Sequence, residues 1–341
     1  MSWKRIWKSV AGALAGLAIL NAFCAVYHNP SPYQWAEHRA TDTIRKPLSY
    51  DIQAKEGFCL VQVDENGYSN PPKAGDEEIS VLMMGSSHTE GFNMLPGQIV
   101  SAVLERELRA AGRTGRVYNI GVSRHIFARN AANMPRALAR FRPTDFVVIE
   151  TSSVVMTSMM VWNAMHDVYP RLPATNIPLS FITHQPLFKR IYKQMLDLLF
   201  ADADPEQEEG GTLMQLMTPE NLELYEQALT EWFALLSEQA RAAGVRLIIM
   251  YHPHLIPQMD GSFASDTIEP CLAAFRSACE KTGVIFLDLT EAFMRAAEDE
   301  HRLPHGFANT AMGIGHLNPT GHRIAAEELC RVILEEEAAV Q

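Results

Sequence analysis

The sequence has little positive charge and lacks the spacing patterns of a metal site. Its 29 Lys and Arg residues stand against 40 Asp and Glu, which gives a formal charge of -11. This balance excludes the basic surface that nucleic acids require, so no nucleic-acid partner is expected. No cysteine pair has structural-zinc spacing, and no His-Glu-x-x-His motif occurs. We therefore expect no cofactor and no metal.

Cysteine is also scarce. Beyond an apolar N-terminal segment that contains Cys24, the chain has only Cys59, Cys271, Cys279 and Cys330. Cys271 and Cys279 would lie about 12 Å apart on one predicted helix, too far for a disulfide. A disulfide between other elements stays open, but ordinary buried thiols are favoured.

The N-terminal segment has the length of a membrane helix. Ser9 to Tyr27 is interrupted only by Asn21, and at about 1.5 Å per residue it spans roughly 28 Å. Basic residues precede it and are scarce just after it, which predicts a cytoplasmic N-terminus and an extracytoplasmic domain, periplasmic or at the cell surface. A cleaved signal peptide is the competing interpretation, but Phe23 and Cys24 make a poor cleavage site.

The remaining chain suggests one domain behind a linker. We expect an anchor at residues 1–28, a stalk or linker at 29–76 because of its turn clusters, and a domain at 77–341. A long insertion rich in Met occupies about residues 155–217. It contains an amphipathic stretch, residues 188–196, that would cover a pocket, lie on a membrane or, as we favour, pack on the core.

Short apolar runs alternate with helical patterns through the domain. The predicted strands are Ile79–Met84, Val117–Ile120, Phe146–Glu150, Val245–Tyr251 and Val284–Leu287. The helices between them include Gln98–Ala111, Ala128–Arg140, Pro219–Ala243 and Asp266–Thr282. This alternation predicts an α/β fold with a mainly parallel five-stranded sheet between two helical layers.

Polar residues gather where these strands end. In VLMMGSSHTEGFNM the first strand stops at Gly85 and exposes Ser86 and Ser87, and the loop GIGHLNPTGHRIAAEEL before the last helix offers His316 and His322. Ligands of such sheets bind at the carboxyl ends of the strands. A serine with a histidine in reach is the usual arrangement for a nucleophile and its base.

Three blocks carry a family resemblance: GSSHTEG from Gly85, YNIGVS around Gly121, and HLNPTGH from His316. In these blocks the chain resembles the SGNH/GDSL hydrolase family, over about residues 79–335. The resemblance implies a flavodoxin-like α/β/α fold, with Ser87 as the nucleophile and His316 as its base. It also implies that the backbone N–H groups of Ser87 and Gly121 donate to the oxyanion.

Other family positions are altered, so substitutes are required. Ser86 stands where the family has Asp, Ser152 and Val154 stand where its third block has Gly and Asn, and Gly313 replaces the Asp three before the histidine. The candidates for the third oxyanion donor are Thr151, Ser152, Ser153 and Asn163. The candidates for holding the second ring nitrogen of the histidine are Glu150, which we favour, Glu90 and a carbonyl near Gly313.

The other histidines have less defined roles. His88 is expected beside the nucleophile, and His322 is expected to be a structural hydrogen-bonder. His252 and His254 follow the fourth strand, and a metal site of these two with His316 and Asp288 is a disfavoured alternative.

These patterns predict a membrane-anchored serine ester hydrolase that forms an acyl-enzyme. The resemblance implies an O-acylated carbohydrate or another small ester as substrate. A degenerate glycan-binding protein and an O-acyltransferase on the same fold are the alternatives, and the oligomeric state stays open.

Overall fold

The computed structural model describes residues 3–27, 33–35, 40–41, 43–70, 78–152 and 219–340. A five-stranded sheet forms its centre, in the order β11-β8-β7-β5-β6, with every neighbouring pair parallel. The strands are β5 (Ile79–Met84), β6 (Gly115–Asn119), β7 (Phe146–Thr151), β8 (Arg246–Tyr251) and β11 (Ile285–Asp288). The parallel sheet predicted from the apolar runs is therefore confirmed.

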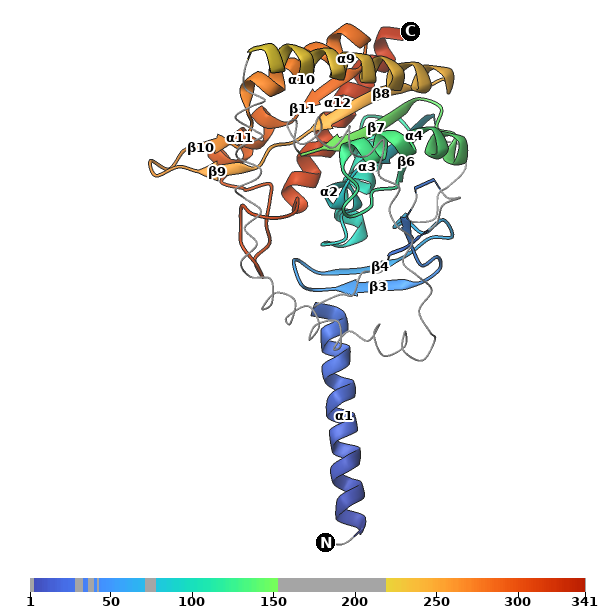
Figure 1. Ribbon diagram of the computed structural model, residues 1–341, viewed down its shortest axis with the longest axis vertical. Coiled ribbons are helices and arrows are strands. Elements are labelled where there is room, and N and C mark those ends of the chain that lie inside the picture. Colours follow the sequence, from blue (N-terminus) through green and yellow to red (C-terminus); the bar gives the residue numbers. More distant parts are fainter. Residues whose placement is uncertain are drawn as a thin grey trace.

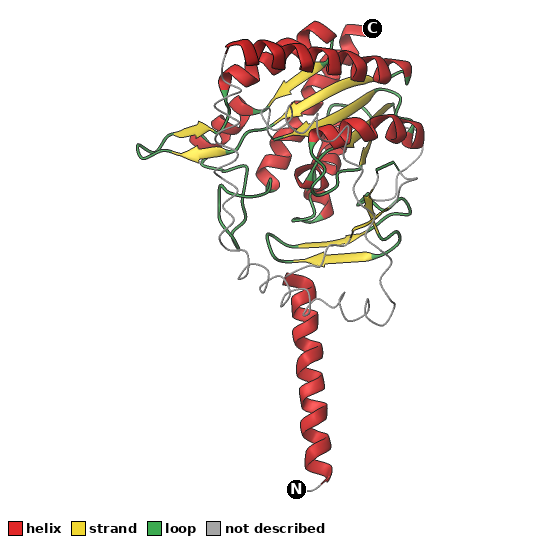
Figure 2. Cartoon of the chain, in the orientation of Figure 1, coloured by secondary structure: helices red, strands yellow, loops and turns green. Residues whose placement is uncertain are grey.

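Helices cover both faces of this sheet (Figures 1 and 2). Leu82 and Met84 of β5 belong to one buried cluster, with α4 (Phe127–Phe141), α9 (Pro219–Ala242) and α10 (Glu269–Thr282). Val81 and Met83 belong to the other, with α3 (Val100–Ala110), α11 (Thr290–Glu298) and α12 (Pro319–Val340). Successive strand side chains point to opposite faces, so a strand covered on both sides is apolar throughout.

The stretch before the sheet differs from the expected stalk. It forms two antiparallel pairs, β1 (Tyr33–Trp35) with β2 (Thr43–Arg45) and β3 (Tyr50–Gln53) with β4 (Cys59–Gln62). Within the stretch Ile44, Cys59 and Tyr68 are buried, as is Arg45, which pairs with Glu90 beyond β5. A solvated stalk would expose these side chains. In Figure 1 the β3–β4 hairpin lies between α1 (Trp3–Tyr27) and the sheet.

The N-terminal helix is long and apolar enough to cross a membrane. The qualifying segment is Trp3–Cys24, with a mean hydropathy of 1.5 and none of its window buried. A signal sequence would meet the same criteria. All five cysteines are free and buried, as predicted for ordinary thiols.

Smaller elements complete the described part of the chain. They are α2 (Ser87–Glu90), the 3-10 turn η1 (Pro96–Gln98), and the hairpin of β9 (Leu255–Pro257) with β10 (Phe263–Ser265). The predicted insertion at 155–217, with its amphipathic stretch, lies outside the described residues.

Candidate active site

Strand β5 ends in a tight turn that presents Ser87. The chain passes from Met84 through Gly85 and Ser86 into α2, of which Ser87 is the first residue. A Cβ on Gly85 would lie 2.0 Å from Oγ1 of Thr89 and 2.6 Å from Oε2 of Glu150. Only glycine allows this approach, because real Cβ contacts are far longer. The turn thus holds Ser87 at the carboxyl edge of the sheet.

His316 reaches Ser87 from the loop before α12. Its Nε2 lies 2.9 Å from Oγ of Ser87, within hydrogen-bond distance. Both side chains are partly exposed, so a substrate can approach them. The pair that the sequence motifs predict is therefore brought together, in the geometry that a serine nucleophile and its base require.

The other ring nitrogen of His316 is held by Glu56. Oε2 of Glu56 lies 2.5 Å from Nδ1, and Oε1 accepts the backbone N–H of His316 at 2.9 Å. Burial raises the pKa of Glu56, but the hydrogen bonds and charge of His316 outweigh burial, and the pKa lies below its ordinary value. The carboxylate is thus anionic near neutral pH, as an acid that orients a histidine must be.

The position of Glu56 depends on the β3–β4 turn, which is bonded to the His316 loop. Oδ1 of Asn309 accepts the N–H of Gly57 at 2.8 Å, while Nδ2 donates to the carbonyls of Ala54 and Gly57 at 3.1 and 3.0 Å. Gly315 allows close contact, since a Cβ there would lie 2.4 Å from Oε1 of Glu56 and its φ is +96°. The β3–β4 hairpin and the loop that contains His316 are therefore bonded to each other.

Glu150, favoured from the sequence as the orienting acid, has different partners. It is 2% exposed and accepts hydrogen bonds from the N–H of Ser86 at 2.7 Å and the Oγ–H of Ser86 at 2.8 Å, and its Oε1 lies 3.0 Å from Nε2 of His252. Burial raises the pKa of Glu150, but bonds and charge from His252 and bonds from Ser86 outweigh burial and lower it. Glu150 thus fixes the turn before Ser87 and does not bond to His316.

Glu90, the other acidic candidate, is also engaged elsewhere. It pairs with Arg45 from β2 and accepts the N–H and Oγ–H of Ser123 at 2.9 and 2.7 Å. Its role is to tie α2 to the N-terminal strands and to the loop after β6.

The predicted oxyanion donors differ in availability. The N–H of Ser87 has no acceptor among the described residues, as befits the first residue of a helix. The N–H of Gly121 donates to Oδ1 of Asn119 at 2.9 Å, and a Cβ on Gly121 would lie 2.5 Å from the backbone nitrogen of Glu90. Ser152 is half-buried just after β7, whereas Ser153 and Asn163 lie outside the described residues.

Four further histidines surround the pair. The ring of His88 lies 4.7 to 5.9 Å, between centroids, from the rings of His252, His305, His316 and His254. Nδ1 of His88 accepts the N–H of Leu317 at 3.2 Å, so its ring lies beside the loop that contains His316. Asp288, named with His254 in the metal alternative, instead bonds to Arg276 at 3.0 Å.

His322 lies apart from this group. It is fully buried, and its Nδ1 accepts the N–H of Val100 at 2.9 Å. The structural role predicted for it agrees with this bond.

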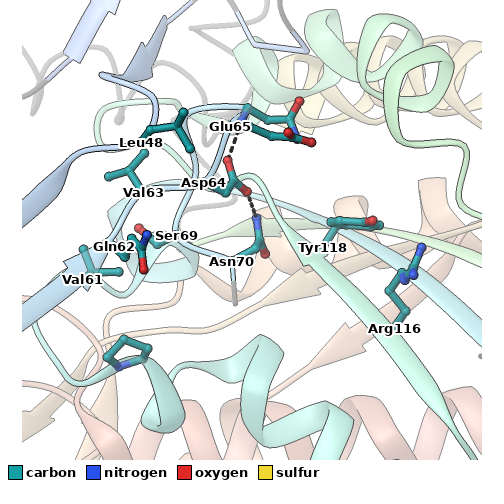
Figure 3. Close-up of a pocket in the computed structure, with 12 residues that line it drawn as sticks. Leu48, Val61, Gln62, Val63, Asp64, Glu65, Ser69, Asn70, Arg116 and Tyr118 are labelled. Atoms are coloured by element: carbon teal, nitrogen blue, oxygen red, sulfur yellow. Dashed lines mark hydrogen bonds between the residues drawn. The ribbon is translucent and has the colours of Figure 1, made fainter. Parts of the chain in front are cut away.

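A cavity of about 610 Å³ lies elsewhere, between the N-terminal strands and the β6 edge (Figure 3). Its walls include Asp64, Asn70, Arg116 and Tyr118, but no histidine. The side-chain amide of Asn70 donates to Asp64 at 3.1 Å and to the carbonyl of Asn119 at 2.9 Å, so these groups brace the chain. The cavity does not contain the serine–histidine pair.

Comparison with known proteins gives structural likeness alone. No protein-family model and no curated protein matches the chain. Solved structures of SGNH/GDSL hydrolases resemble it over about three quarters of its length. TesA has 16% sequence identity and a TM-score of 0.40, covering 75% of this chain and 98% of its own.

Two esterases show similar values. EstA from Pseudoalteromonas sp. is 10% identical with a TM-score of 0.41, covering 76% of this chain and 100% of its own. An acetyl xylan esterase from Geobacillus stearothermophilus is 16% identical with a TM-score of 0.41, covering 75% of this chain and 95% of its own. At such values the reaction must be inferred from the residues of this chain.

Proposed function

We propose that the chain is a serine ester hydrolase in which Ser87, His316 and Glu56 act together. The observation that carries the proposal is the unbroken series of contacts from Glu56 through both nitrogens of His316 to Oγ of Ser87. The carboxylate of Glu56 fixes the tautomer of His316 that carries its proton on Nδ1, and Nε2 is then free to accept the proton of Ser87.

The proposed reaction proceeds through an acyl-enzyme. Oγ of Ser87 attacks the ester carbonyl carbon while its proton passes to Nε2 of His316. The resulting oxyanion accepts a hydrogen bond from the N–H of Ser87. The tetrahedral intermediate then collapses and expels the alcohol, which receives the proton from His316. Water then attacks the carbonyl carbon of the acyl group while His316 accepts its proton. The second intermediate releases the acid, and Oγ of Ser87 takes the proton back from His316.

A second oxyanion donor completes the proposal. Two of the candidates are described: Thr151 is buried as the last residue of β7, and Ser152 is half-buried just after it. β7 is adjacent in the sheet to the strand that leads to Ser87, and we favour the more accessible hydroxyl of Ser152. Gly121 would have to release Asn119 before its N–H served this purpose. Each such donor contributes about 3 to 4 kcal/mol to the transition state in comparable sites.

The location and substrate are further parts of the proposal. An uncleaved α1 would anchor the enzyme with its N-terminus in the cytoplasm and its sheet domain outside, in agreement with Lys4, Arg5 and Lys8 before the apolar segment. The substrate would be a small O-acyl ester, such as an acetyl group on a surface carbohydrate. Transfer of the acyl group to another alcohol uses the same residues, with that alcohol replacing water.

One observation favours a second function, glycan binding without turnover. The N–H of Gly121 is occupied, so an oxyanion has fewer ready donors than the sequence motif implies. The two functions differ in whether Ser87 is an activated nucleophile.

The test is covalent labelling by a fluorophosphonate, which reacts with activated serines. We would treat the full-length chain in detergent micelles and measure its intact mass beside Ser87→Ala, His316→Ala and, as a control, Ser262→Ala in the exposed β9–β10 turn. One adduct on the wild type and the control, absent from the other two, is expected. A folded wild type without adduct from about pH 7 to 9, where an ordinary histidine base is mainly neutral, would exclude the hydrolase and favour glycan binding.

A further inference from the structure

We propose that His88, His252 and His305 form a binding site for a zinc ion beside Ser87. One nitrogen from each ring can be chosen so that all three lie within 4.8 Å of one another. The three residues come from separate segments: α2, the end of β8 and the loop before α12. The site differs from the metal alternative raised by the sequence, and it stands or falls independently of ester hydrolysis.

Buried nitrogens without partners are the first argument for this site. His252 and His305 are 0% and 1% exposed. Nδ1 of His252 and both ring nitrogens of His305 have no hydrogen-bond partner among the described residues. Buried polar atoms are rarely left unpaired in folded proteins, and those that lack a protein partner commonly bind an ion or a water molecule. One unpaired nitrogen from each of these two rings can reach a shared ligand, and one ring nitrogen of His88 lies within the same 4.8 Å.

The surroundings orient His252 as a metal ligand. Its Nε2 is held by Oε1 of Glu150 at 3.0 Å, which leaves Nδ1 for the ion. Metal-bound histidines usually donate their second N–H to a carboxylate in this way, which fixes the tautomer and makes the ligand more basic. Glu150 is itself fixed by Ser86, so the arrangement is rigid.

His88 and His305 are also held in position. His305 pairs with Leu317 through a backbone bridge, and its carbonyl accepts the N–H of Gly313 at 2.9 Å. Nδ1 of His88 accepts the N–H of Leu317 at 3.2 Å, so the proton of the neutral ring lies on Nε2. Zinc would bind one ring nitrogen while the proton stays on the other, so His88 would exchange the Leu317 hydrogen bond for the ion.

The dimensions and the chemistry favour zinc. The ring centroids of the three histidines lie 4.7, 5.7 and 5.8 Å apart. Zinc–nitrogen bonds of about 2.0 to 2.1 Å in a tetrahedron place ligand atoms roughly 3.4 Å apart. The chosen nitrogens lie within 4.8 Å of one another, so the rings would rotate toward the ion on binding. Three histidines with one open position are typical of zinc, and imidazole is a ligand that zinc prefers.

Neighbouring histidines are excluded as ligands because they are already engaged. His254 faces Asp266, and its Nε2 lies 3.4 Å from the carbonyl of Gly315. His316 is held between Glu56 and Ser87.

A zinc ion at this site would affect the active site, because its ligand His88 is the residue after Ser87. A bound ion would fix the first turn of α2 and place positive charge near the nucleophile.

The first experiment measures zinc on the wild type. The full-length chain in detergent is stripped with EDTA, dialysed against micromolar Zn²⁺ and analysed by mass spectrometry for metal, and its X-ray absorption spectrum is recorded. We expect about one zinc ion per chain, with scattering from imidazole rings. A folded chain that retains no zinc, or zinc without imidazole scattering, would overturn the proposal and assign the unpaired nitrogens to buried water.

The second experiment compares His305→Gln with His322→Gln. His322 is an equally buried histidine outside the cluster and serves as the matched control. His305→Gln is expected to weaken zinc binding by about tenfold or more, and Zn²⁺ should raise the Tm of the wild type and of His322→Gln but not of His305→Gln. Equal binding and equal Tm shifts in all three proteins would refute the site. If circular dichroism shows either variant unfolded, the wild-type absorption spectrum decides.

Discussion

Glu56 and His316 are separated by 260 positions in the sequence, yet Oε2 of the one lies 2.5 Å from Nδ1 of the other. The acid belongs to the turn between β3 and β4, and the base belongs to the loop before the last helix. The candidate active site is therefore complete only when both ends of the described chain are folded together.

We expect Glu56→Gln to slow fluorophosphonate labelling of Ser87 by about 10³- to 10⁴-fold, because an amide leaves His316 in the wrong tautomer while preserving the shape of the side chain. The labelling rate, followed by intact mass, measures the effect. The control is Glu65→Gln, an exposed glutamate of the same N-terminal stretch. Equal rates for Glu56→Gln and wild type would mean that Glu56 only supports the fold.

Asn309 should act through Glu56. Asn309→Ala removes the three hydrogen bonds that hold the β3–β4 turn. We expect labelling of Ser87 to slow by about tenfold, since misplacement of a supporting group by about 1 Å is costly in preorganised sites.

A double-mutant cycle distinguishes this role from general destabilisation. In the Glu56→Gln background, Asn309→Ala should have little further effect on the labelling rate, because the group that it positions is already lost. Independent, additive losses would contradict the positioning role.

The sheet was predictable from the sequence because its strands are buried on both faces. Such strands contain little besides apolar residues, and VLMM in β5 is fully buried in the structure. The Ser87–His316 contact was predictable from the motifs and the fold together: Ser87 follows the carboxyl end of β5, and the loop before the last helix was expected to return to the same edge.

The role of Glu56 was not predictable in the same way. The stretch that contains Glu56 also contains Asn66, Gly67 and Pro71, which indicate turns, and this turn-rich composition predicts a stalk. The alternation of buried Cys59, Val61 and Val63 was the available signal that this stretch packs against the domain. The contact with His316 itself leaves no local trace, because it depends on how two distant loops meet. His305 was likewise overlooked, since no motif surrounds it.

Gly121 is expected to be required for stability. A Cβ at this position would lie 2.5 Å from the nitrogen of Glu90 and 2.9 Å from its Cα, so Gly121→Ala must displace backbone. The free energy of unfolding should fall by about 2 to 3 kcal/mol. The control is Gly97→Ala, where nothing lies within 4 Å of the added atom.

Gly97→Ala should change stability by less than about 1 kcal/mol. Both variants are compared with wild type by chemical denaturation of the full-length chain. Similar midpoints for Gly121→Ala and Gly97→Ala would show that the loop after β6 can yield, and the close packing of Gly121 on α2 would then have little energetic weight.

The contact between Glu56 and His316 should also make stability depend on pH. Burial raises the pKa of Glu56, but the bonds and charge of His316 outweigh burial, so the folded pKa lies below the ordinary value. In the unfolded chain the pKa of a glutamate is about 4.3. Between these two values the unfolded state binds more protons, and acid therefore favours unfolding. The stabilisation is complete above about pH 5 and is lost as the pH falls through the folded pKa.

Since Gln does not titrate, the difference in unfolding free energy between wild type and Glu56→Gln should shrink on acidification. Urea denaturation of both proteins at a series of pH values measures it, and a difference that stays constant or grows toward low pH would show that Glu56 is not held as an anion by His316.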